Sequence, residues 1–273
     1  MRVLHAATEL FPYVKVGGLG DVLGALPVAL HHAGADVRLL LPGYPVLLEQ
    51  LHGLHRVGAY PDVLGHGEVQ ILRGRSAAGI TVYLADHPWF NRTGGPYDEQ
   101  GDSGLRFGAF SWLAARLGLD GDGHGWQPDI LHLHDWQTGL APVHVRHAPG
   151  TRLRTVFTIH NLAYQGIYGP DLVPHLWLPP YVFHMLGVEF HGDLSFLKAG
   201  LQHADRLTTV SPTYAREIQT PAFGERLDGL LAHRAEDLVG ILNGIDPEVW
   251  SPGKGEGLAM HYSIARPSGK KVC

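Results

Sequence analysis

The chain has 273 residues, 45% of them hydrophobic, and a formal net charge of −5 at pH 7. This acidic balance gives no electrostatic attraction to nucleic acid, and the single cysteine, Cys273, excludes a disulfide framework. No apolar stretch approaches membrane-spanning length, and the first residues run directly into a strand-like segment without a signal-peptide pattern. We therefore expect a cytoplasmic protein with one large α/β domain or two small ones.

The first predicted elements are a strand over residues 2–7, a loop with three glycines and a helix that begins at Asp21. Glycine lets a ligand approach the backbone closely, and a helix start presents unpaired N–H groups. Lys15 adds a positive charge beside Gly17 and Gly18. The loop is therefore a candidate anion site, with Asp21 as the expected helix N-cap.

The glycine spacing leaves a structural alternative open. It matches neither the dinucleotide fingerprint G-x-G-x-x-G nor a Walker loop. On spacing alone, shaping a tight strand-to-helix turn would be a sufficient role for these glycines. Lys15, a charge inside an uncharged stretch, favours the functional interpretation.

The next part of the chain mixes strands with a long loop and a helix. An apolar strand is predicted over 36–41, and alternating segments over 68–72 and 80–84 predict an added antiparallel pair. Residues 87–104 form a loop rich in Gly, Pro, Asn and Asp, and loops of this length usually have a function. Apolar residues at helical spacing predict a helix over 105–117.

After a Gly- and Asp-rich loop, the second half of the chain alternates strands with helices. Strands are predicted over 129–136, 154–161, 206–210 and 238–242, and helices over 138–147, 195–203, 213–219 and 226–234. Residues 163–192 are rich in aromatics, Gly and Pro, which predicts a surface excursion with a short helix near 181–185. The alternation implies a Rossmann-like α/β fold with a doubly wound, mainly parallel sheet covered on both faces.

Polar residues follow three of the predicted strands directly. The Lys15 loop follows the first strand, Asp135 follows a middle strand, and His160 with Asn161 follows the next one. Ligands of doubly wound sheets bind beyond the carboxyl ends of the strands. We therefore expect these three segments to share one ligand site.

His132 and His134 lie on the same face of their predicted strand, which raises the alternative of a metal site. A binuclear hydrolase would need a tight H-x-H-x-D-H run, which Leu133-His134-Asp135-Trp136 does not supply. The 19 histidines are scattered, with no H-E-x-x-H motif or Cys/His cluster. We expect no metal site, and we interpret His132 as a packed strand histidine.

Motifs along the whole chain resemble those of bacterial glycogen synthases and plant starch synthases. The N-terminal ones are Glu9-Leu10-Phe11-Pro12, Lys15-x-Gly17-Gly18-Leu19-x-Asp21 and Leu40-Leu41-Pro42. The later ones are His134-Asp135-Trp136, 157–166, 195–200, 210–215 and Asn243-Gly244-Ile245-Asp246. The likeness runs from residue 1 to about residue 262. It implies the N-terminal half of a GT-B fold, the architecture of retaining glucosyltransferases with two Rossmann-type domains.

The resemblance implies transfer of glucose from ADP-glucose to the non-reducing end of an α-1,4-glucan, with retention of configuration and no cofactor. It implies donor contacts at Lys15, Gly17, Gly18 and Asp21. A cation there would stabilise the charge that grows on the departing phosphate. His160 would face the transferred glucose near its 6-hydroxyl. The leaving phosphate itself accepts the acceptor's proton in this class, so no carboxylate nucleophile is implied.

Further sugar contacts are implied at three positions. Asp135 and Asn161 would hold sugar hydroxyls. The catalytic residues that the resemblance implies are Lys15, Asp135 and His160. Tyr97 would contact the acceptor, because an aromatic ring presents a flat face to a sugar. Structural alternatives remain for two of them: Asp135 as a helix N-cap, and Tyr97 as ordinary loop packing.

The family continues into a second Rossmann-type domain, which would supply the nucleotide pocket. We expect residues 1–246 to form the first domain and 247–273 a linker or the start of the second. This chain alone would then be inactive, with ADP-glucose, an α-1,4-glucan and the second domain as its partners, and with neither nucleic acid nor membrane among them. A non-catalytic α-glucan-binding remnant is the alternative, and a metal-dependent hydrolase is a less favoured one.

Overall fold

The computed structural model describes residues 1–97, 100–245, 251–254 and 257–273. Its contacts divide the chain into two compact units, Met1–Leu242 and Asn243–Cys273. In the second unit, Pro267–Lys271 form a 3-10 turn. Asp246, where the predicted first domain ends and a predicted motif closes, lies outside the described residues. No helix of the described part is both long and apolar enough to cross a membrane.

The first unit is built on strands from its whole length. In chain order they are β1 (Arg2–Ala6), β2 (Asp36–Pro42), β3 (His52–Tyr60), β4 (Val69–Arg75), β5 (Thr81–Asp86), β6 (Ile130–His134), β7 (Arg154–Ile159), β8 (Ile167–Tyr168), β9 (Glu189–Phe190), β10 (Asp193–Ser195), β11 (Arg206–Thr209) and β12 (Leu238–Gly240). Within the described residues, one nine-stranded sheet has the order β12-β11-β7-β6-β1-β2-β5-β4-β3. Its pairs are parallel except β5–β4 and β4–β3, so the expected mainly parallel sheet is confirmed.

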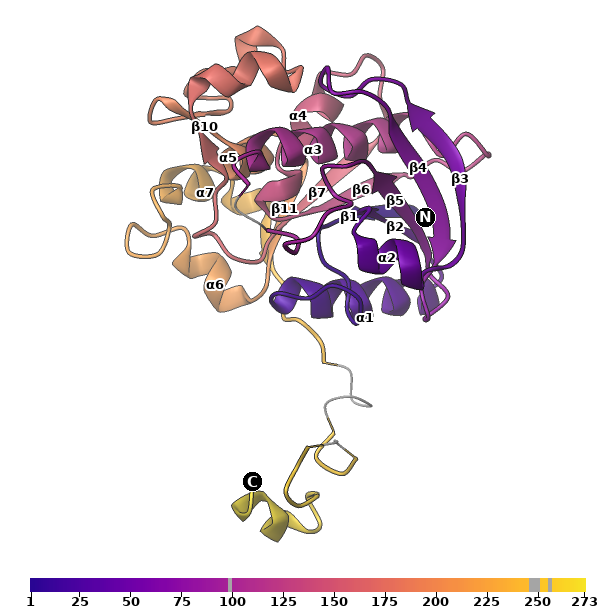
Figure 1. Ribbon diagram of the computed structural model, residues 1–273. Coiled ribbons are helices and arrows are strands. Elements are labelled where there is room, and N and C mark those ends of the chain that lie inside the picture. Colours follow the sequence, from indigo (N-terminus) through magenta and orange to yellow (C-terminus); the bar gives the residue numbers. More distant parts are fainter. Residues whose placement is uncertain (98–99, 246–250, 255–256) are drawn as a thin grey trace. The chain divides into compact units, whose positions relative to one another are not determined.

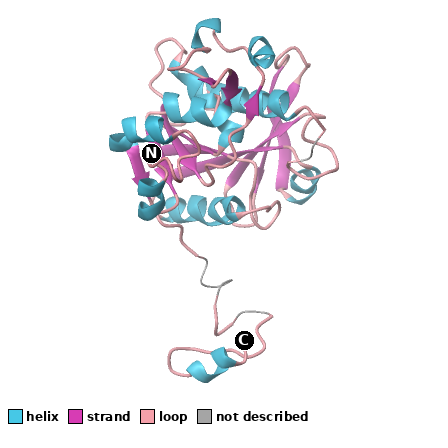
Figure 2. Ribbon diagram, turned by 90° about the vertical axis from the view of Figure 1, so that its left-hand side faces the viewer, coloured by secondary structure: helices cyan, strands magenta, loops and turns pink. Residues whose placement is uncertain are grey.

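Helices cover both faces of this sheet. In chain order they are α1 (Gly18–His32), α2 (Pro45–Gln50), α3 (Ser103–Asp120), α4 (Ala141–Arg146), α5 (Phe196–His203), α6 (Pro212–Glu217) and α7 (Asp228–His233). Figure 1 shows α3, α4 and α5 on one side of the sheet and α1 and α6 on the other. Figure 2 shows the same layers after a quarter turn. The arrangement is a Rossmann-like, doubly wound α/β fold.

The chain changes direction across the sheet between β1 and β6. From β1 the strands proceed to β2 and β5 on one side, and from β6 to β7, β11 and β12 on the other. β1 and β6 are themselves paired in parallel, with Val3 opposite Ile130 and Ala6 opposite Leu133. In open α/β sheets the crevice beyond such a switch point is the usual ligand site.

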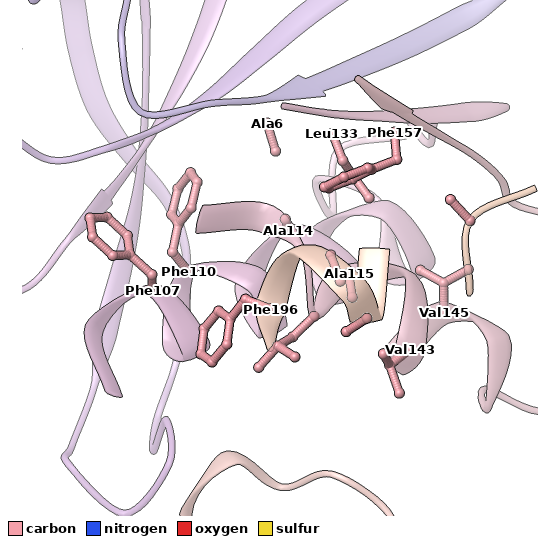
Figure 3. Packing of buried hydrophobic residues seen from close by; sticks show 14 of the residues in the cluster. Ala6, Phe107, Phe110, Ala114, Ala115, Leu133, Val143, Val145, Phe157 and Phe196 are labelled. Atoms are coloured by element: carbon pink, nitrogen blue, oxygen red, sulfur yellow. The ribbon is translucent and has the colours of Figure 1, made fainter. Parts of the chain in front are cut away.

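The larger apolar core lies between the sheet and α3. Phe107, Phe110 and Ala114 of this helix belong to one buried cluster with Leu133 of β6 and Phe157 of β7 (Figure 3). Their helical spacing predicted this helix, and α3 confirms it, running three residues beyond the predicted end to Asp120. Burying a phenylalanine fully stabilises the fold by about 1.5–3 kcal/mol. This core makes the sheet a rigid base for the loops at its edge.

The prediction that Asp21 caps the first helix is wrong. α1 begins at Gly18 with Gly17 as its N-cap residue, and Asp21 lies in the first turn, where it pairs with Lys15. Glycine is an acceptable N-cap because it needs no side-chain bond there to adopt the extended conformation. The acidic residue still lies near the positive end of the helix dipole.

Two segments differ from the sequence-based expectation. The edge strand β3 was not predicted, because its glycines, histidines and arginine give it no regular alternation of apolar residues. In the surface excursion, the expected short helix over 181–185 is a 3-10 turn over Pro180–Val182. A second 3-10 segment spans Pro170–Leu176, and β8, β10 and β9 form a small antiparallel sheet beside it.

Candidate active site

The glycine-rich loop between β1 and α1 is held by a buried carboxylate, Glu9. This residue is 3% exposed, and its Oε2 accepts hydrogen bonds from the backbone N–H groups of Val16 (2.8 Å) and Gly17 (3.0 Å). Its Oε1 accepts the hydroxyl proton of Tyr97 at 2.8 Å. Glu9 thus fixes the backbone that leads into the first turn of α1. Sequence reasoning gave Glu9 no role, although an isolated acid just after a buried strand was a usable signal.

Lys15 and the two glycines behind it form an open surface. The Lys15 ammonium lies 2.8 Å from the carboxylate of Asp21, and both side chains are partly exposed. Gly17 and Gly18 do not have positive φ, and a Cβ on either would meet no atom within 4 Å. A tight turn therefore does not require glycine at these positions. Room for a ligand at the backbone, next to a cation, is what an anion site needs.

Asp135 follows β6 with a strained backbone, at φ 57° and ψ 179°. A non-glycine residue held in such a region costs on the order of 1–3 kcal/mol, and such residues cluster at functional sites. Its Oδ1 accepts a hydrogen bond from the backbone N–H of His160 at 2.8 Å. Burial raises the pKa of Asp135 to about 7, although the N–H groups of His160 and Asn161 oppose the rise. Near neutral pH this carboxyl can therefore accept or donate a hydrogen bond.

Asp135 occupies the N-cap position of a short helix, as its structural alternative expected, but its carboxylate does not cap that helix. It precedes a 3-10 turn over Trp136–Thr138, but its side chain makes no capping hydrogen bond to that turn. The Thr138 hydroxyl instead donates to the backbone carbonyls of His134 and Asp135. The carboxylate of Asp135 is thereby left to bind the loop after β7.

His160, at the end of β7, closes a chain of three imidazoles. Its Nε2 lies 3.0 Å from Nδ1 of His134, and Nε2 of His134 lies 3.0 Å from Nδ1 of His5. His5 and His134 are completely buried. Burial lowers the pKa of His5 to about 3 and that of His160 to about 4, and it lowers the pKa of His134 well below its ordinary value. All three rings are therefore neutral at pH 7.

Hydrogen-bond accounting assigns a direction to this chain. A neutral imidazole has one N–H donor and one acceptor nitrogen. Nε2 of His5 is buried without a partner, and a buried orphan acceptor is less costly than a buried orphan N–H. His5 therefore donates from Nδ1 to His134, which donates from Nδ1 to Nε2 of His160. This direction leaves the proton of His160 on Nδ1, for which the described residues supply no partner.

His132 packs within the sheet, as its interpretation as a strand histidine expected. Its Nε2 lies 2.6 Å from the Thr158 hydroxyl, and its ring stacks on His134. Among the described residues, His5, His132 and His134 each bring one ligand atom within 4.8 Å of the others. His134 already uses both ring nitrogens in hydrogen bonds to imidazoles, so binding an ion with all three would break at least one of them.

Tyr97 and Asn161 occupy different surroundings. The Tyr97 hydroxyl is bonded to Glu9 and to the Thr8 hydroxyl, each at 2.8 Å, and its ring packs against Phe107. This matches the loop-packing alternative for Tyr97 and makes it a support for Glu9. Asn161 is exposed, and its Oδ1 accepts the N–H of Ala163 at 3.0 Å, so only its amide nitrogen is open to a ligand.

Glu9 binds the glycine loop and acts electrostatically on two other predicted site residues. Burial raises the pKa of Asp135 and lowers that of His160, and the charge of Glu9 raises both by a smaller amount. Lys15 joins this group through the loop backbone, since its own ammonium binds Asp21. The three segments follow the adjacent strands β1, β6 and β7, and Asp135 and His160 are in direct contact.

Residues 2–233 match the family model of the starch synthase catalytic domain. The chain belongs to this family. A glycogen synthase of Paramagnetospirillum magneticum is 52% identical over 280 residues, which cover 99% of this chain and 56% of that protein. A glycogen synthase of Variovorax paradoxus is 49% identical over 288 residues, which cover 100% of this chain and 57% of that protein. The chain therefore spans just over half the length of these starch synthase family members.

A solved starch synthase structure confirms the fold. It is the catalytic domain of starch synthase IV from Arabidopsis thaliana bound to ADP and acarbose, with a TM-score of 0.83 and 31% sequence identity. The match covers 98% of this chain and 56% of that one. The resemblance found in the motifs is thus confirmed, as is the Rossmann-like part of a GT-B glycosyltransferase fold.

Proposed function

We propose that this chain is the glycine-loop half of a glycogen synthase, which transfers glucose from ADP-glucose to the non-reducing end of an α-1,4-glucan with retention of configuration. The placement of the Glu9-bound Lys15 loop and of the bonded pair Asp135 and His160 after three adjacent parallel strands carries the proposal. The glycogen synthases among its relatives support the reaction, and the starch synthase bound to ADP supports the donor.

In this proposal the loop receives the donor's diphosphate. Glu9 occupies the N–H groups of Val16 and Gly17, so the following amides of the first α1 turn are the ones that face the ligand. The Lys15 ammonium leaves Asp21 or bridges it to the phosphate, and it stabilises the negative charge that develops as the glucose–phosphate bond breaks. A phosphate at a helix N-terminus also gains from the helix dipole.

Asp135 and His160 act on the sugar. His160 donates from Nδ1 to a hydroxyl of the transferred glucose, since its other nitrogen is engaged by His134. Asp135 positions the loop that carries His160 by accepting its backbone N–H, and it can hold a sugar hydroxyl through its second oxygen. No carboxylate nucleophile enters this scheme, and the reaction uses no cofactor beyond the donor.

The rest of the donor site belongs to a second domain in this proposal. The relatives are longer than the part that this chain covers, and their uncovered part would hold the adenosine and more of the diphosphate. The chain alone is then inactive. We place the reaction in the cytoplasm, in keeping with a sequence that has one cysteine.

The test is incorporation of radiolabelled glucose from ADP-glucose into glycogen. It compares this chain with a fusion of the chain to the uncovered part of the Paramagnetospirillum magneticum relative. We expect turnover by the fusion only. Lys15→Ala should lower its kcat/KM by about 10²- to 10³-fold, as loss of one transition-state charge partner does. The control, Arg154→Ala at an exposed position on β7, should stay within about twofold.

Each result has a defined consequence. Turnover by the chain alone would overturn the need for a second domain. Full activity of the Lys15→Ala fusion would overturn the role of the loop. A fusion that binds maltoheptaose but neither binds ADP-glucose nor transfers glucose would favour the glucan-binding alternative.

A further inference from the structure

A second cationic region lies at the opposite end of the sheet from the candidate active site. It is a pocket of about 260 Å³, here called the arginine pocket. The side chains that define it are Arg38, His52, His55, Arg73, Arg75 and Thr81. It opens near the first residues of β2 and β5, whereas the Lys15 loop, Asp135 and His160 follow the last residues of their strands. Arg38 precedes the end of β2 by four residues, which is about 13 Å of extended chain.

Strand register places these side chains in two rows on one face. Arg38 pairs with Thr81, Thr81 with Arg75, and Arg75 with His52. In the adjoining row, two residues along β5 and β4 and three along β3, where the register shifts, Tyr83 pairs with Arg73 and Arg73 with His55. Paired residues on neighbouring strands project to the same face of a sheet. Three guanidinium groups and two imidazoles therefore gather over β2, β5, β4 and β3.

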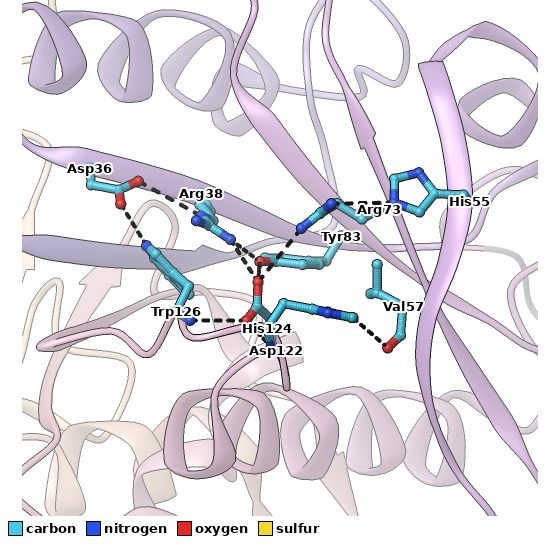
Figure 4. Close-up of polar contacts among 9 residues, drawn as sticks. All are labelled: Asp36, Arg38, His55, Val57, Arg73, Tyr83, Asp122, His124 and Trp126. Atoms are coloured by element: carbon cyan, nitrogen blue, oxygen red, sulfur yellow. Dashed lines mark hydrogen bonds and ion pairs between the residues drawn. The ribbon is translucent and has the colours of Figure 1, made fainter.

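One buried carboxylate, Asp122, organises the inner wall of the pocket (Figure 4). Its Oδ2 accepts from Arg38 Nη1 at 2.8 Å and from the Tyr83 hydroxyl at 2.8 Å, and it lies 3.9 Å from Arg73 Nη1. Burial alone would raise the pKa of Asp122, but the N–H groups of His124 and Trp126, the Tyr83 hydroxyl and Arg38 together hold that pKa below its usual value. Asp122 is therefore ionised at neutral pH.

Arg73 is held in place by two partners. His55 Nδ1 lies 2.7 Å from the Gly53 carbonyl, which can only accept, and its Nε2 lies 3.3 Å from Arg73 Nη2, which can only donate. These partners fix His55 as the neutral Nδ1–H tautomer. With Asp122 on its other side, the Arg73 guanidinium is oriented before any ligand arrives (Figure 4).

The pocket has more positive charge than its carboxylates offset. Arg38 and Arg73 share Asp122, and Arg38 also lies 3.7 Å from Asp36. Arg75 donates to the Gly79 carbonyl, and no described residue forms an ion pair with it. Its guanidinium is exposed at the mouth of the pocket with N–H groups unused. A chain of net charge −5 thus concentrates an uncompensated cation beside two preoriented ones.

We propose that the arginine pocket binds a phosphate group, either free inorganic phosphate or the monoester of a small metabolite. The guanidinium fork matches phosphate oxygens with paired hydrogen bonds, and the Thr81 hydroxyl adds a donor in the same row. The volume lies below the range of about 300–1,000 Å³ typical of larger ligands. The lining contains no aromatic ring except imidazole, so it offers no platform for stacking a glucan. This site is independent of the proposed glucose transfer.

The test is calorimetric titration of the full chain in a phosphate-free buffer at pH 7.5. Inorganic phosphate and glycerol 3-phosphate are titrated separately, each against sodium chloride of equal ionic strength. We expect saturable binding that Arg75→Gln weakens about 10- to 100-fold, the effect of losing one hydrogen bond to a charged group. Arg75 pairs with no described carboxylate, so this change leaves the Asp122 network intact. The matched control is Arg154→Gln, an arginine outside the pocket that is 75% exposed.

Thr81→Val provides a second variant, since it retains every charge and is expected to weaken binding severalfold. Preference for glycerol 3-phosphate would identify a monoester as the ligand, and equal or better binding of inorganic phosphate would identify the free anion. The proposal fails if neither compound binds more tightly than chloride, or if Arg75→Gln and Arg154→Gln behave alike while circular dichroism shows both folded.

Discussion

The two ends of the parallel strands hold their buried polar groups in opposite ways. At the ends of β1, β6 and β7, the buried groups are neutral imidazoles, the Glu9 carboxylate and the carboxyl of Asp135, whose pKa is raised to about 7. At the start of β2 and β5, the buried carboxylate of Asp122 is ionised and fully bonded. The first end holds uncharged imidazoles and a strained Asp135, which suits a site that a charged ligand completes. At the second end the buried groups already bond one another, and only Arg75 at the mouth of the pocket carries a charge without an ion-pair partner among the described residues.

The largest effect we expect comes from Asp122→Ala. Removing one partner of a buried charge pair leaves the other uncompensated, so the free energy of unfolding should fall by about 3–5 kcal/mol. Urea denaturation measures it. Glu68→Ala is the control, because Glu68 and its partner Arg56 are both exposed and such pairs contribute about 0–1 kcal/mol. Equal effects of the two changes would mean that the arginine network does not stabilise this end of the sheet.

Glu9→Ala should have the next largest effect, at the other end. It leaves the N–H groups of Val16 and Gly17 and the Tyr97 hydroxyl without their acceptor, which should cost about 2–3 kcal/mol of stability. Glu9→Gln keeps one acceptor oxygen and should cost about half as much. In the fused enzyme, both variants should lower glucose transfer at temperatures where the protein is fully folded. Loss of stability with normal transfer would separate Glu9 from the active site.

The sequence shows the strands and the polar residues that follow them more clearly than the contacts that hold those residues in place. The contact between Asp135 and His160 could be predicted, because apolar strands and the polar residues that follow them are local patterns. Glu9 and Asp122 could not, because each acts through contacts with residues far along the chain, such as Tyr97 for Glu9 and Arg38 for Asp122.

The misplaced start of α1 and the missing β3 have related causes. Two glycines at 17 and 18 oppose a helix by propensity, and the helix start is set by hydrogen bonds from the Val16 and Gly17 backbone to the Glu9 carboxylate, which propensity does not describe. Strand β3 is stabilised by its pairing with β4 and not by burial, since most of its residues are exposed or half-buried. In both cases specific hydrogen bonds override local preference.

Because of the histidine chain, the two ends of the sheet should also differ in how their stability responds to acid. The folded-state pKa values of His5 and His160, about 3 and 4, lie below the ordinary value of 6.5. Their contribution is therefore complete above pH 6.5 and is lost as pH falls, by about 1 kcal/mol per pH unit for each histidine. Unfolding measured at pH 7, 6 and 5 should show this slope.

His5→Phe should reduce that slope, whatever it does to stability at pH 7. His31→Phe, at an exposed position of α1, is the matched control. The folded-state pKa of Asp122 is lowered, so its contribution to stability is lost only at a lower pH than that of the histidines. A slope unchanged by His5→Phe would show that the imidazole chain is not what makes the site end sensitive to mild acid.

Asp135→Asn should change the stability with the opposite sign. Because its folded-state pKa is raised from 3.8 to about 7, Asp135 destabilises the folded chain increasingly as pH rises through that window. Asparagine removes the charge, keeps an acceptor for the His160 N–H and tolerates positive φ. The variant should match the wild type near pH 4 and exceed its stability at pH 8, while glucose transfer by the fused enzyme falls. Asp171→Asn, at an exposed position, is the control. If Asp135→Asn gave no gain at pH 8, the carboxylate would have to be charged and compensated in the folded chain, as Asp122 is, and the contrast between the two ends of the sheet would be lost.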